Sequence, residues 1–437
     1  MFKIRKSIVL ASTVGSIIEI YDLFLFGLLS SFIATSFFPE SASNTLIKTL
    51  LIFSIGYIAR PLGSITFGVI SDYYGRKRSL YISILLMGIS TLMIALLPGY
   101  NTLGNLSIAL LVTLRVIQGF SAGGEYTNAI TFLVEHSNQA DRGFLGSLAT
   151  MGTNTGALLA IAATTVFLYL QSRYHFSQEY WRVLFLLSVP GTFLGLYIRK
   201  HVPESIEFIK CSLSTNKTSF WVIAKSCVCN VISNPKRSLA LLFFTIQGVS
   251  VTSILLVYTP IFLTKTTGFS AAHAQTFNLF SIITLILVIP LAGKLSDKWG
   301  RMRLTALSSI GLFAISLVYF ALLNQGTQTS ILTALIIASA LTAGFAVSAS
   351  VLIVEILPIS IRATSAALIY GAGAAIFGSS MPLFSELIVK LTKNPVAPGY
   401  LMSCLSCLGI IGFVLLRSYL NPKNSKVIHN QALQPQA

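Results

Sequence analysis

Long apolar runs separated by short polar stretches make up most of the chain. Twelve of these runs each have about 20 residues or more, which is the length that an α-helix needs to cross a bilayer. The pattern therefore predicts an all-α membrane protein with twelve transmembrane helices. The predicted helices cover residues 8–37, 46–70, 79–98, 105–128, 143–170, 181–199, 238–263, 275–293, 304–323, 329–354, 363–389 and 399–420.

One connection between the runs is much longer than the others. It covers residues 200–237 and separates the predicted helices into two sets of six. We therefore expect an N-terminal six-helix bundle over 1–199, a linker over 200–237, a C-terminal six-helix bundle over 238–420 and a tail over 421–437. Because each set has an even number of helices, both termini and the linker are expected on one side of the membrane.

The composition excludes an ordinary water-soluble protein. Only 10% of the residues are charged and 54% are apolar, whereas soluble domains carry about 25% charged residues. The net charge of +17 would suggest nucleic-acid binding in a soluble protein. Here the basic residues lie between apolar runs, so we attribute them to membrane topology and contact with anionic lipids, and we expect no nucleic-acid partner.

The basic residues are divided unequally between the two predicted sides. Arg60 and Arg115 lie inside predicted helices, and 22 of the 30 Lys and Arg residues lie on the side of the termini and the linker. Cytoplasmic loops are enriched in Lys and Arg, so we expect both termini to be cytoplasmic. The opposite side holds only Lys48, Arg173, Arg182, Lys265, Lys390 and Lys393.

An internal repeat follows the second and the eighth predicted helices. A shorter repeat follows the fourth and the tenth predicted helices, where Glu135 and Arg142 recur 220 residues later as Glu355 and Arg362. Two loops repeated at nearly the same offset predict two homologous halves with internal pseudo-symmetry. The longer repeat has an offset of 225 and relates Gly68, Ser71, Asp72, Gly75, Arg76 and Arg78 to Gly293, Ser296, Asp297, Gly300, Arg301 and Arg303.

The repeated loops have the residues that a latch between the two halves would need. An Asp at the end of one helix and a nearby Arg can cap neighbouring helix ends and pair with charges on other helices, while glycines permit tight turns. Alternatively, these residues only anchor the helices and set their orientation. The predicted cytoplasmic latch comprises Gly68, Asp72, Gly75, Arg76, Lys77, Glu135, Arg142, Asp297, Gly300, Arg301, Glu355 and Arg362.

These loops resemble the major facilitator superfamily. Its most specific mark is the Gly-x-x-x-Asp-x-x-Gly-Arg-Lys loop at 68–77, although Tyr73 stands where many members carry Arg or Lys, and 115–119 matches a second family motif. The resemblance implies two six-helix bundles, alternating access and a bacterial inner membrane. Residues 15–22, 60–63 and 118–126 resemble more narrowly the metabolite:H⁺ symporter branch of this superfamily. That branch contains proline/betaine, oxoglutarate, citrate and shikimate carriers.

Three ionisable residues inside predicted helices are candidates for proton coupling, because charges at the bilayer centre are costly and therefore often functional. Asp22 and Arg115 lie about 21 Å and 15 Å along helices that enter from opposite sides, so they can meet. Such a pair can alternate between a deprotonated, paired state and a protonated, released state, and the resemblance implies the same. Alternatively, it is a permanent ion pair. Glu19 shares the helix face of Asp22 and is the second proton carrier that we consider.

Further polar residues are candidates for substrate binding. Arg60 can bind a substrate carboxylate, or it pairs permanently with Glu19 or Glu125. We expect Glu125 to act at an inner gate or as a structural partner. Small-residue spacings, such as Gly119 with Gly123, predict close helix packing. The other residues expected to line a midplane cavity are Tyr21, Tyr57, Gln118, Tyr126, Asn154 and Gln247.

Together these features predict a proton-coupled symporter that imports a small zwitterionic or anionic metabolite. Proline or betaine is the first candidate, because Arg, acidic and aromatic groups can meet both ends of a zwitterion. The alternatives are an organic-acid symporter, an efflux antiporter and, from a different class, a membrane receptor without transport. We find no catalytic residue set and no metal-ligand spacing, so we expect no enzyme activity and no cofactor. The expected partners are the substrate, protons and membrane lipids, and we expect a monomer.

Overall fold

The structure is a computed structural model that describes residues 2–39, 45–175, 177–214, 220–378 and 380–420. In these residues the regular structure is helical, and twelve helical segments are long and apolar enough to cross a membrane. This confirms the predicted all-α class and the number of spans. The predicted tail over 421–437 and part of the predicted linker lie outside the described residues.

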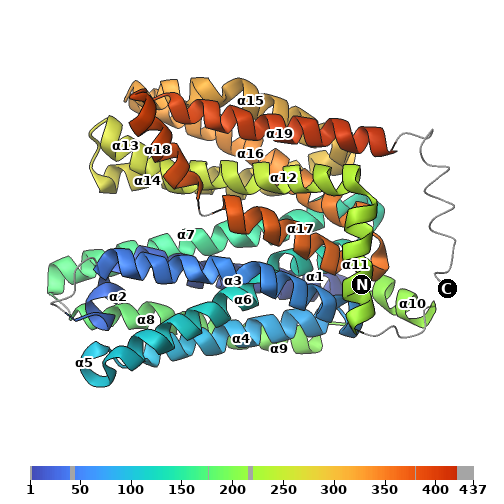
Figure 1. Ribbon diagram of the computed structural model, residues 1–437, viewed down its shortest axis with the longest axis horizontal. Coiled ribbons are helices and arrows are strands. Elements are labelled where there is room, and N and C mark those ends of the chain that lie inside the picture. Colours follow the sequence, from blue (N-terminus) through green and yellow to red (C-terminus); the bar gives the residue numbers. More distant parts are fainter. Residues whose placement is uncertain (1, 40–44, 176, 215–219, 379, 421–437) are drawn as a thin grey trace.

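The first six spans form one bundle (Figure 1). The run predicted over 8–37 divides near Leu29 into two helices. The helices of this bundle are α1 (Phe2–Leu28), α2 (Ser30–Phe37), α3 (Thr45–Tyr74), α4 (Arg76–Leu96), α5 (Tyr100–Leu103), α6 (Asn105–Glu135), α7 (Arg142–Tyr174), α8 (Trp181–Leu186) and α9 (Ser188–His201). The last two together form the sixth span.

The last six spans form the second bundle. Two helices lie between the bundles in the chain, α10 (Ile206–Ser214) and α11 (Phe220–Ser233). The second bundle comprises α12 (Pro235–Ser253), a π-helical turn (Ile254–Tyr258), α13 (Thr259–Thr266), α14 (Ala271–Trp299), α15 (Arg301–Asn324), α16 (Gln328–Ile356), α17 (Arg362–Phe377), α18 (Met381–Thr392) and α19 (Ala397–Leu420).

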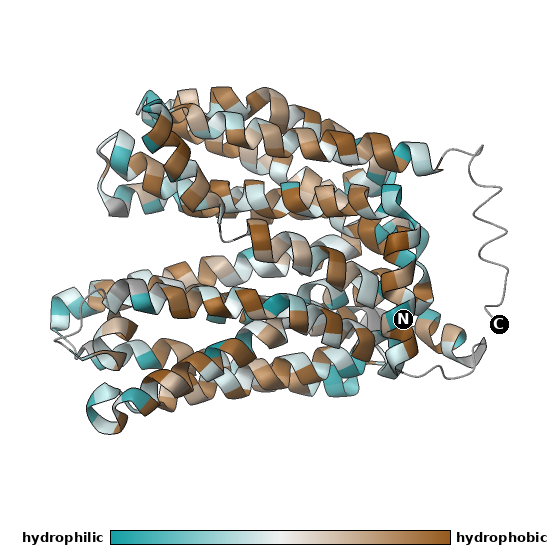
Figure 2. Ribbon diagram, in the orientation of Figure 1, coloured by the Kyte–Doolittle hydropathy of each residue, from teal (hydrophilic) through white to brown (hydrophobic). Residues whose placement is uncertain are grey.

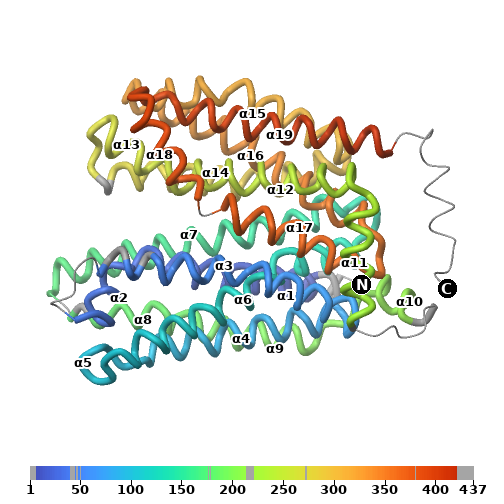
Figure 3. The backbone as a smooth tube through the Cα atoms, viewed as in Figure 1, coloured from blue at the N-terminus to red at the C-terminus, as the bar shows by residue number. Residues whose placement is uncertain are grey.

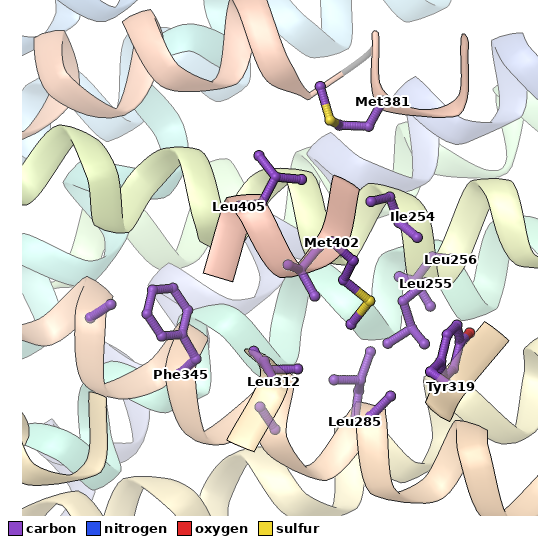
Figure 4. Close-up of a cluster of buried hydrophobic side chains, with 14 of the residues drawn as sticks. Ile254, Leu255, Leu256, Leu285, Leu312, Tyr319, Phe345, Met381, Met402 and Leu405 are labelled. Carbon is purple, nitrogen blue, oxygen red and sulfur yellow. The ribbon is translucent and has the colours of Figure 1, made fainter. Parts of the chain in front are cut away.

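Apolar side chains dominate the length of the helices, and hydrophilic residues gather at the two ends of the molecule (Figure 2). The core of the second bundle is built from large apolar side chains that interdigitate between its helices (Figure 4). Examples are Leu312, Tyr319 and Phe345, which are all buried. A second cluster, which includes Phe26 and Trp181, lies wholly in the first bundle. Other apolar contacts cross between the bundles, since Ile161 joins the core of the second bundle and Val351 and Val354 join a cluster of the first.

Glycines let helices of the first bundle approach closely, as their spacing predicts. A Cβ on Gly119 of α6 would overlap the carbonyl oxygen of Gly56 on α3, and a Cβ on Gly156 of α7 would overlap the carbonyl oxygen of Ile17 on α1. These two contacts fix the positions of α1 and α3, which carry the acidic and basic candidates of the first two spans.

Two interfaces join the bundles, one between α3 and α17 and the other between α14 and α7 (Figure 3). The sequence repeat relates α3 to α14 with an offset of 225, and α7 to α17 with an offset of 220. The two interfaces are therefore pseudo-symmetric copies of each other. The repeated loops at 68–78 and 293–303 lie at the same end of the molecule, which we call the latch end.

Candidate functional site

A cavity of about 240 Å³ lies between the two bundles. Pockets that hold drug-sized ligands measure roughly 300–1,000 Å³, so this size suits a small metabolite. The predicted residues Glu19, Tyr57, Arg60, Tyr126 and Asn154 line it, as does Tyr370 of the second bundle, which the sequence analysis did not select.

Arg60 and Glu19 form an ion pair at this cavity. The Arg60 Nη2 atom lies 3.4 Å from Glu19 Oε1, and the two side chains are 12% and 5% exposed. The Arg60 guanidinium also lies 4.7 Å from the centre of the Tyr57 ring. Arg60 Nε and Glu19 Oε2 are buried without a hydrogen-bond partner among the described residues. The pair thus has free donor and acceptor positions, and it matches one of the two arrangements expected for Arg60.

Tyr126 joins the two bundles next to the cavity. Its hydroxyl lies 3.1 Å from Thr150 Oγ1 of the first bundle and 3.0 Å from Ser350 Oγ of the second. Its ring centre lies 4.9 Å from that of Tyr370. A movement of one bundle relative to the other would break these contacts, so Tyr126 links the cavity to the interface.

Asp22 and Arg115 do not form the direct ion pair that the sequence suggested. Thr91 Oγ1 donates to Asp22 Oδ2 (2.6 Å), Gln118 Nε2 donates to Thr91 Oγ1 (2.8 Å), and Arg115 Nη1 donates to Gln118 Oε1 (2.8 Å). All four side chains are buried. Two uncharged side chains therefore connect the carboxylate to the guanidinium in a hydrogen-bonded relay.

Two aromatic rings lie next to the guanidinium group of Arg115. Its guanidinium lies 4.3 Å from the ring centre of Phe26 and 5.2 Å from that of Phe53. Its Nε and Nη2 atoms have no hydrogen-bond partner among the described residues. A buried guanidinium held by π contacts and one amide keeps unused donors, so it can accept a new partner when its surroundings change.

Three of the residues expected around the cavity lie elsewhere. Tyr21 turns toward α8 and donates to the carbonyl oxygen of Leu184 (3.0 Å). Gln118 belongs to the relay. Gln247 accepts from Ser309 (3.0 Å) inside the second bundle. The expectation that they line the cavity is wrong for this conformation, because polarity marked them but did not reveal the face of the helix on which each lies.

The first repeated loop closes the latch end with buried charges. Arg76 pairs with Asp72 (2.6 Å) and with Glu135 (3.1 Å), and these three side chains have no solvent exposure. Glu135 also pairs with Arg362 of the second bundle (3.2 Å). Asp72 accepts from the backbone N–H groups of Ala363 and Thr364 and from the Thr364 hydroxyl, at 2.6–3.2 Å. The carboxylate thus caps the first turn of α17, where the helix dipole favours negative charge.

The second repeated loop makes the equivalent contacts at the other interface. Asp297 accepts from the backbone N–H groups of Gly143 and Phe144 at 2.8 Å, at the start of α7. Asp297 pairs with Arg301 (2.7 Å), which pairs with Glu355 (3.3 Å). These side chains are 10–21% exposed, so this cluster is wetter than the first.

Glycines shape both loops and their contact surfaces. Gly75 and Gly300 have φ angles of 109° and 94°, which L side chains rarely adopt. A Cβ on Gly68 would lie 2.6 Å from the Cα atom of Thr364. Lys77, the remaining predicted latch residue of the first loop, makes its contact within the first bundle. It donates to the carbonyl oxygen of Lys200 (2.8 Å). The structure thus brings the predicted latch residues to one end of the molecule; their role as a latch stays a prediction.

The comparisons with known proteins decide the family. Residues 13–370 match the Major Facilitator Superfamily. The chain belongs to this superfamily. This confirms the resemblance and the fold that it implies.

Relatives of known name cover most of this superfamily member. The proline/betaine transporter of Escherichia coli (strain K12) is 28% identical over 439 residues, with 96% of this chain and 84% of that protein covered. The glycine betaine/proline/ectoine/pipecolic acid transporter OusA of Dickeya dadantii is 27% identical over 424 residues, with the same shares covered. The solved structure of the proton:xylose symporter XylE bound to 6-bromo-6-deoxy-D-glucose has the same fold, with a TM-score of 0.75, 21% identity and 96% of each chain covered.

Sequence reasoning missed the partner of Glu125. Arg199 is the last residue of the predicted helix over 181–199, and its buried side chain forms an ion pair with Glu125. Arg199 also donates to the carbonyl oxygens of Ala11 and Leu80, and Ser83 donates to Glu125 Oε2 (2.5 Å). The position of Arg199 at the end of an apolar run gave no signal that the side chain points into the bundle.

The linker residues of the latch were also missed. Glu207 pairs with Arg142 (2.6 Å) and with Arg362 (2.7 Å), and so joins the two halves. Ser205 donates to Glu135 (2.5 Å). Glu204 accepts from the backbone N–H of Arg76 (3.1 Å), at the start of α4. The chain is basic and has few acidic residues. Each acidic residue of the linker was therefore recognisable as a candidate partner for a latch arginine.

Proposed function

We propose that this chain is a proton-coupled symporter that imports a small zwitterionic metabolite of the proline or betaine class. The observation that carries the proposal is the Arg60–Glu19 ion pair at the edge of a small cavity between two bundles. Its unused donor and acceptor atoms can serve a ligand that carries both charges. The names of the related transporters from Escherichia coli and Dickeya dadantii support this substrate class.

In this proposal the two charges of the substrate bind to different groups that line the cavity. Its carboxylate pairs with Arg60 in bidentate geometry and displaces Glu19. Its ammonium group lies among the rings of Tyr57, Tyr126 and Tyr370, where cation–π attraction suits a quaternary or secondary amine. Asn154 offers an additional amide on the first-bundle wall.

Proton coupling would use Asp22 and, next to the substrate, Glu19. When Arg60 turns to the substrate, Glu19 loses its positive partner, which favours its protonation. Protonation of Asp22 at Oδ2 gives that residue an O–H donor, so the Thr91 hydroxyl can turn from donor to acceptor, and it removes the negative charge at the Asp22 end of the relay to Arg115. Substrate and proton therefore favour the same rearrangement of the first bundle.

Alternating access would occur by rocking of the two bundles about the cavity. We propose that the latch end is cytoplasmic, because the Lys and Arg excess lies there, and that it is closed in this conformation. We further propose bundles at 1–199 and 238–420, a linker at 200–237, both termini in the cytoplasm of a bacterium and a monomeric unit. We also propose transport without enzymatic chemistry, which the names of the related transporters support.

Purified protein in liposomes tests this function. Labelled proline, betaine, oxoglutarate and citrate are supplied outside, with and without a pH step that is acid outside. We expect proline or betaine to accumulate only with the step, and Arg60→Gln to abolish this accumulation. The control variant Arg182→Gln changes an arginine that pairs with Glu179 away from the cavity and should behave as the wild type.

Other outcomes would identify the alternatives. Accumulation of oxoglutarate or citrate instead would make the chain an organic-acid symporter. Expulsion of preloaded compound under the same step would make it an efflux antiporter. Binding of a ligand without any flux would leave a receptor role.

A further inference from the structure

A groove of about 940 Å³ lies at the latch end of the interface between α14 and α7. Lys294 and Lys298 of α14 and Lys6 of α1 line it, and all three are exposed. Its apolar wall comes from the first bundle and includes Leu10 and Leu145. The groove therefore combines a basic rim with a hydrophobic wall, and both bundles contribute to it.

The pseudo-symmetric copy of this interface has a different cover. There α11 packs against α3 and α17. Its Ile223 forms an apolar cluster with Val69 of α3 and Ile361, next to the start of α17, and Tyr73 packs against the cluster. The chain thus uses a helix of its linker to cover one of the two equivalent surfaces.

The residues that contact α11 are replaced at the second interface. With the offset of 225, Val69 and Tyr73 correspond to Lys294 and Lys298. The helix-covered surface is apolar, whereas its copy presents two ammonium groups at the same positions. An apolar helix would not cover such a surface without burying these charges, which is costly.

We propose that an anionic phospholipid of the adjoining leaflet binds in this groove, as the counterpart of α11 at the other interface. Its phosphate would bind to Lys294 and Lys298, and an acyl chain would lie along Leu10 and Leu145. Two membrane spans border the groove, and one begins at Lys6 while the other ends at Trp299. The three lysines therefore lie at the depth of the lipid headgroups.

The local charges favour an anion. Besides its three lysines, the groove is lined by Asp141 and Asp297, so the lysines outnumber the carboxylates. The Asp297 carboxylate is already engaged by Arg301 and by two backbone N–H groups. Each Lys near an anionic membrane surface adds to the attraction. A zwitterionic lipid also has a phosphate but no net negative charge, so its attraction to the lysines would be weaker.

A lipid at this place would contact both bundles while Asp297 caps α7. It would therefore stabilise the conformation in which the latch end is closed. This consequence depends on the proposed alternating access, but occupation of the groove does not, and a binding measurement tests it separately.

Native mass spectrometry of the full-length purified protein tests the proposal. The protein is titrated with dioleoylphosphatidylglycerol and, separately, with dioleoylphosphatidylcholine. We expect preferential binding of one phosphatidylglycerol. The double variant Lys294→Val/Lys298→Tyr, which copies the residues of the other interface, should weaken binding of this lipid by roughly 10- to 30-fold.

Matched variants exclude a general effect of charge. Lys225→Gln/Lys236→Gln removes two exposed lysines outside the groove and should leave the preference unchanged. Lys294→Gln/Lys298→Gln provides a second test if the first double variant does not fold. Equal binding of both lipids to the wild type would overturn the proposal, as would an undiminished preference in either groove variant.

Discussion

At the scale of single residues, the main feature is the hydrogen-bonded chain from Asp22 through Thr91 and Gln118 to Arg115. A hydroxyl and an amide can each both donate and accept. A proton on Asp22 Oδ2 would reverse the direction of the first hydrogen bond and remove the negative charge that the relay connects to Arg115. In this account Thr91 and Gln118 transmit the protonation state, and they do not carry the proton themselves.

The first prediction concerns Thr91→Val, which preserves shape but removes the hydroxyl. A hydrogen bond to a charged group is worth about 1.5–3 kcal/mol. We therefore expect uptake driven by a pH step to fall at least about tenfold, while exchange of labelled for unlabelled substrate without a gradient continues. Thr91→Ser is the control and should retain coupling. Full proton-driven accumulation in the valine variant would show that the relay has no role.

The second prediction concerns the buried pair of Glu125 and Arg199. Glu125→Gln leaves a buried guanidinium without its carboxylate, which typically costs about 3–5 kcal/mol. We expect a large loss of stability in denaturant unfolding of the purified protein. The matched control is Glu386→Gln, which breaks an exposed pair with Lys265 and should cost at most about 1 kcal/mol. Equal stabilities of the two variants would argue against a structural role for the buried pair.

At the scale of elements, the latch consists of carboxylates that cap helices of the opposite bundle. Asp72 caps the start of α17, and Asp297 caps the start of α7. The two caps differ in environment, since the Asp72 side chain is fully buried whereas that of Asp297 is 10% exposed. Charged hydrogen bonds are stronger where water is excluded, so the first cap should contribute more to closure.

The third prediction compares Asp72→Asn with Asp297→Asn. Spin labels at positions 74 and 299, both exposed residues of the latch end, report the separation of the bundles after replacement of the five native cysteines. We expect Asp72→Asn to shift the distance distribution toward longer values, and Asp297→Asn to shift it less. Identical distributions in the wild type and both variants would exclude a latch.

The helices and the repeat could be predicted because their signals are strong. A run of about 20 apolar residues marks a membrane helix whatever its neighbours are, and the 225-residue offset placed Asp72 and Asp297 in equivalent loops. Rotation about the helix axis was not predictable in the same way. Because lipid-facing and protein-facing surfaces are both apolar, hydropathy did not reveal that Tyr21 faces α8 or that Arg199 points inward.

At the scale of the whole molecule, two bundles meet at a small cavity that polar and apolar residues line, and at two pseudo-symmetric interfaces. The charge clusters lie at one end of these interfaces, so opening that end requires several ion pairs and helix caps to separate. We propose that the same movement of the bundles that closes this end also changes access to the cavity. The energy to alternate between conformations would come from the proton and the substrate bound together.

Proton movement driven by substrate tests this account most directly. The protein is reconstituted in liposomes that contain a pH-sensitive dye and have no initial pH difference, and proline or betaine is added outside. We predict acidification of the interior that depends on substrate concentration and is absent in Asp22→Asn. Entry of the labelled substrate without any change in internal pH would contradict the central claim.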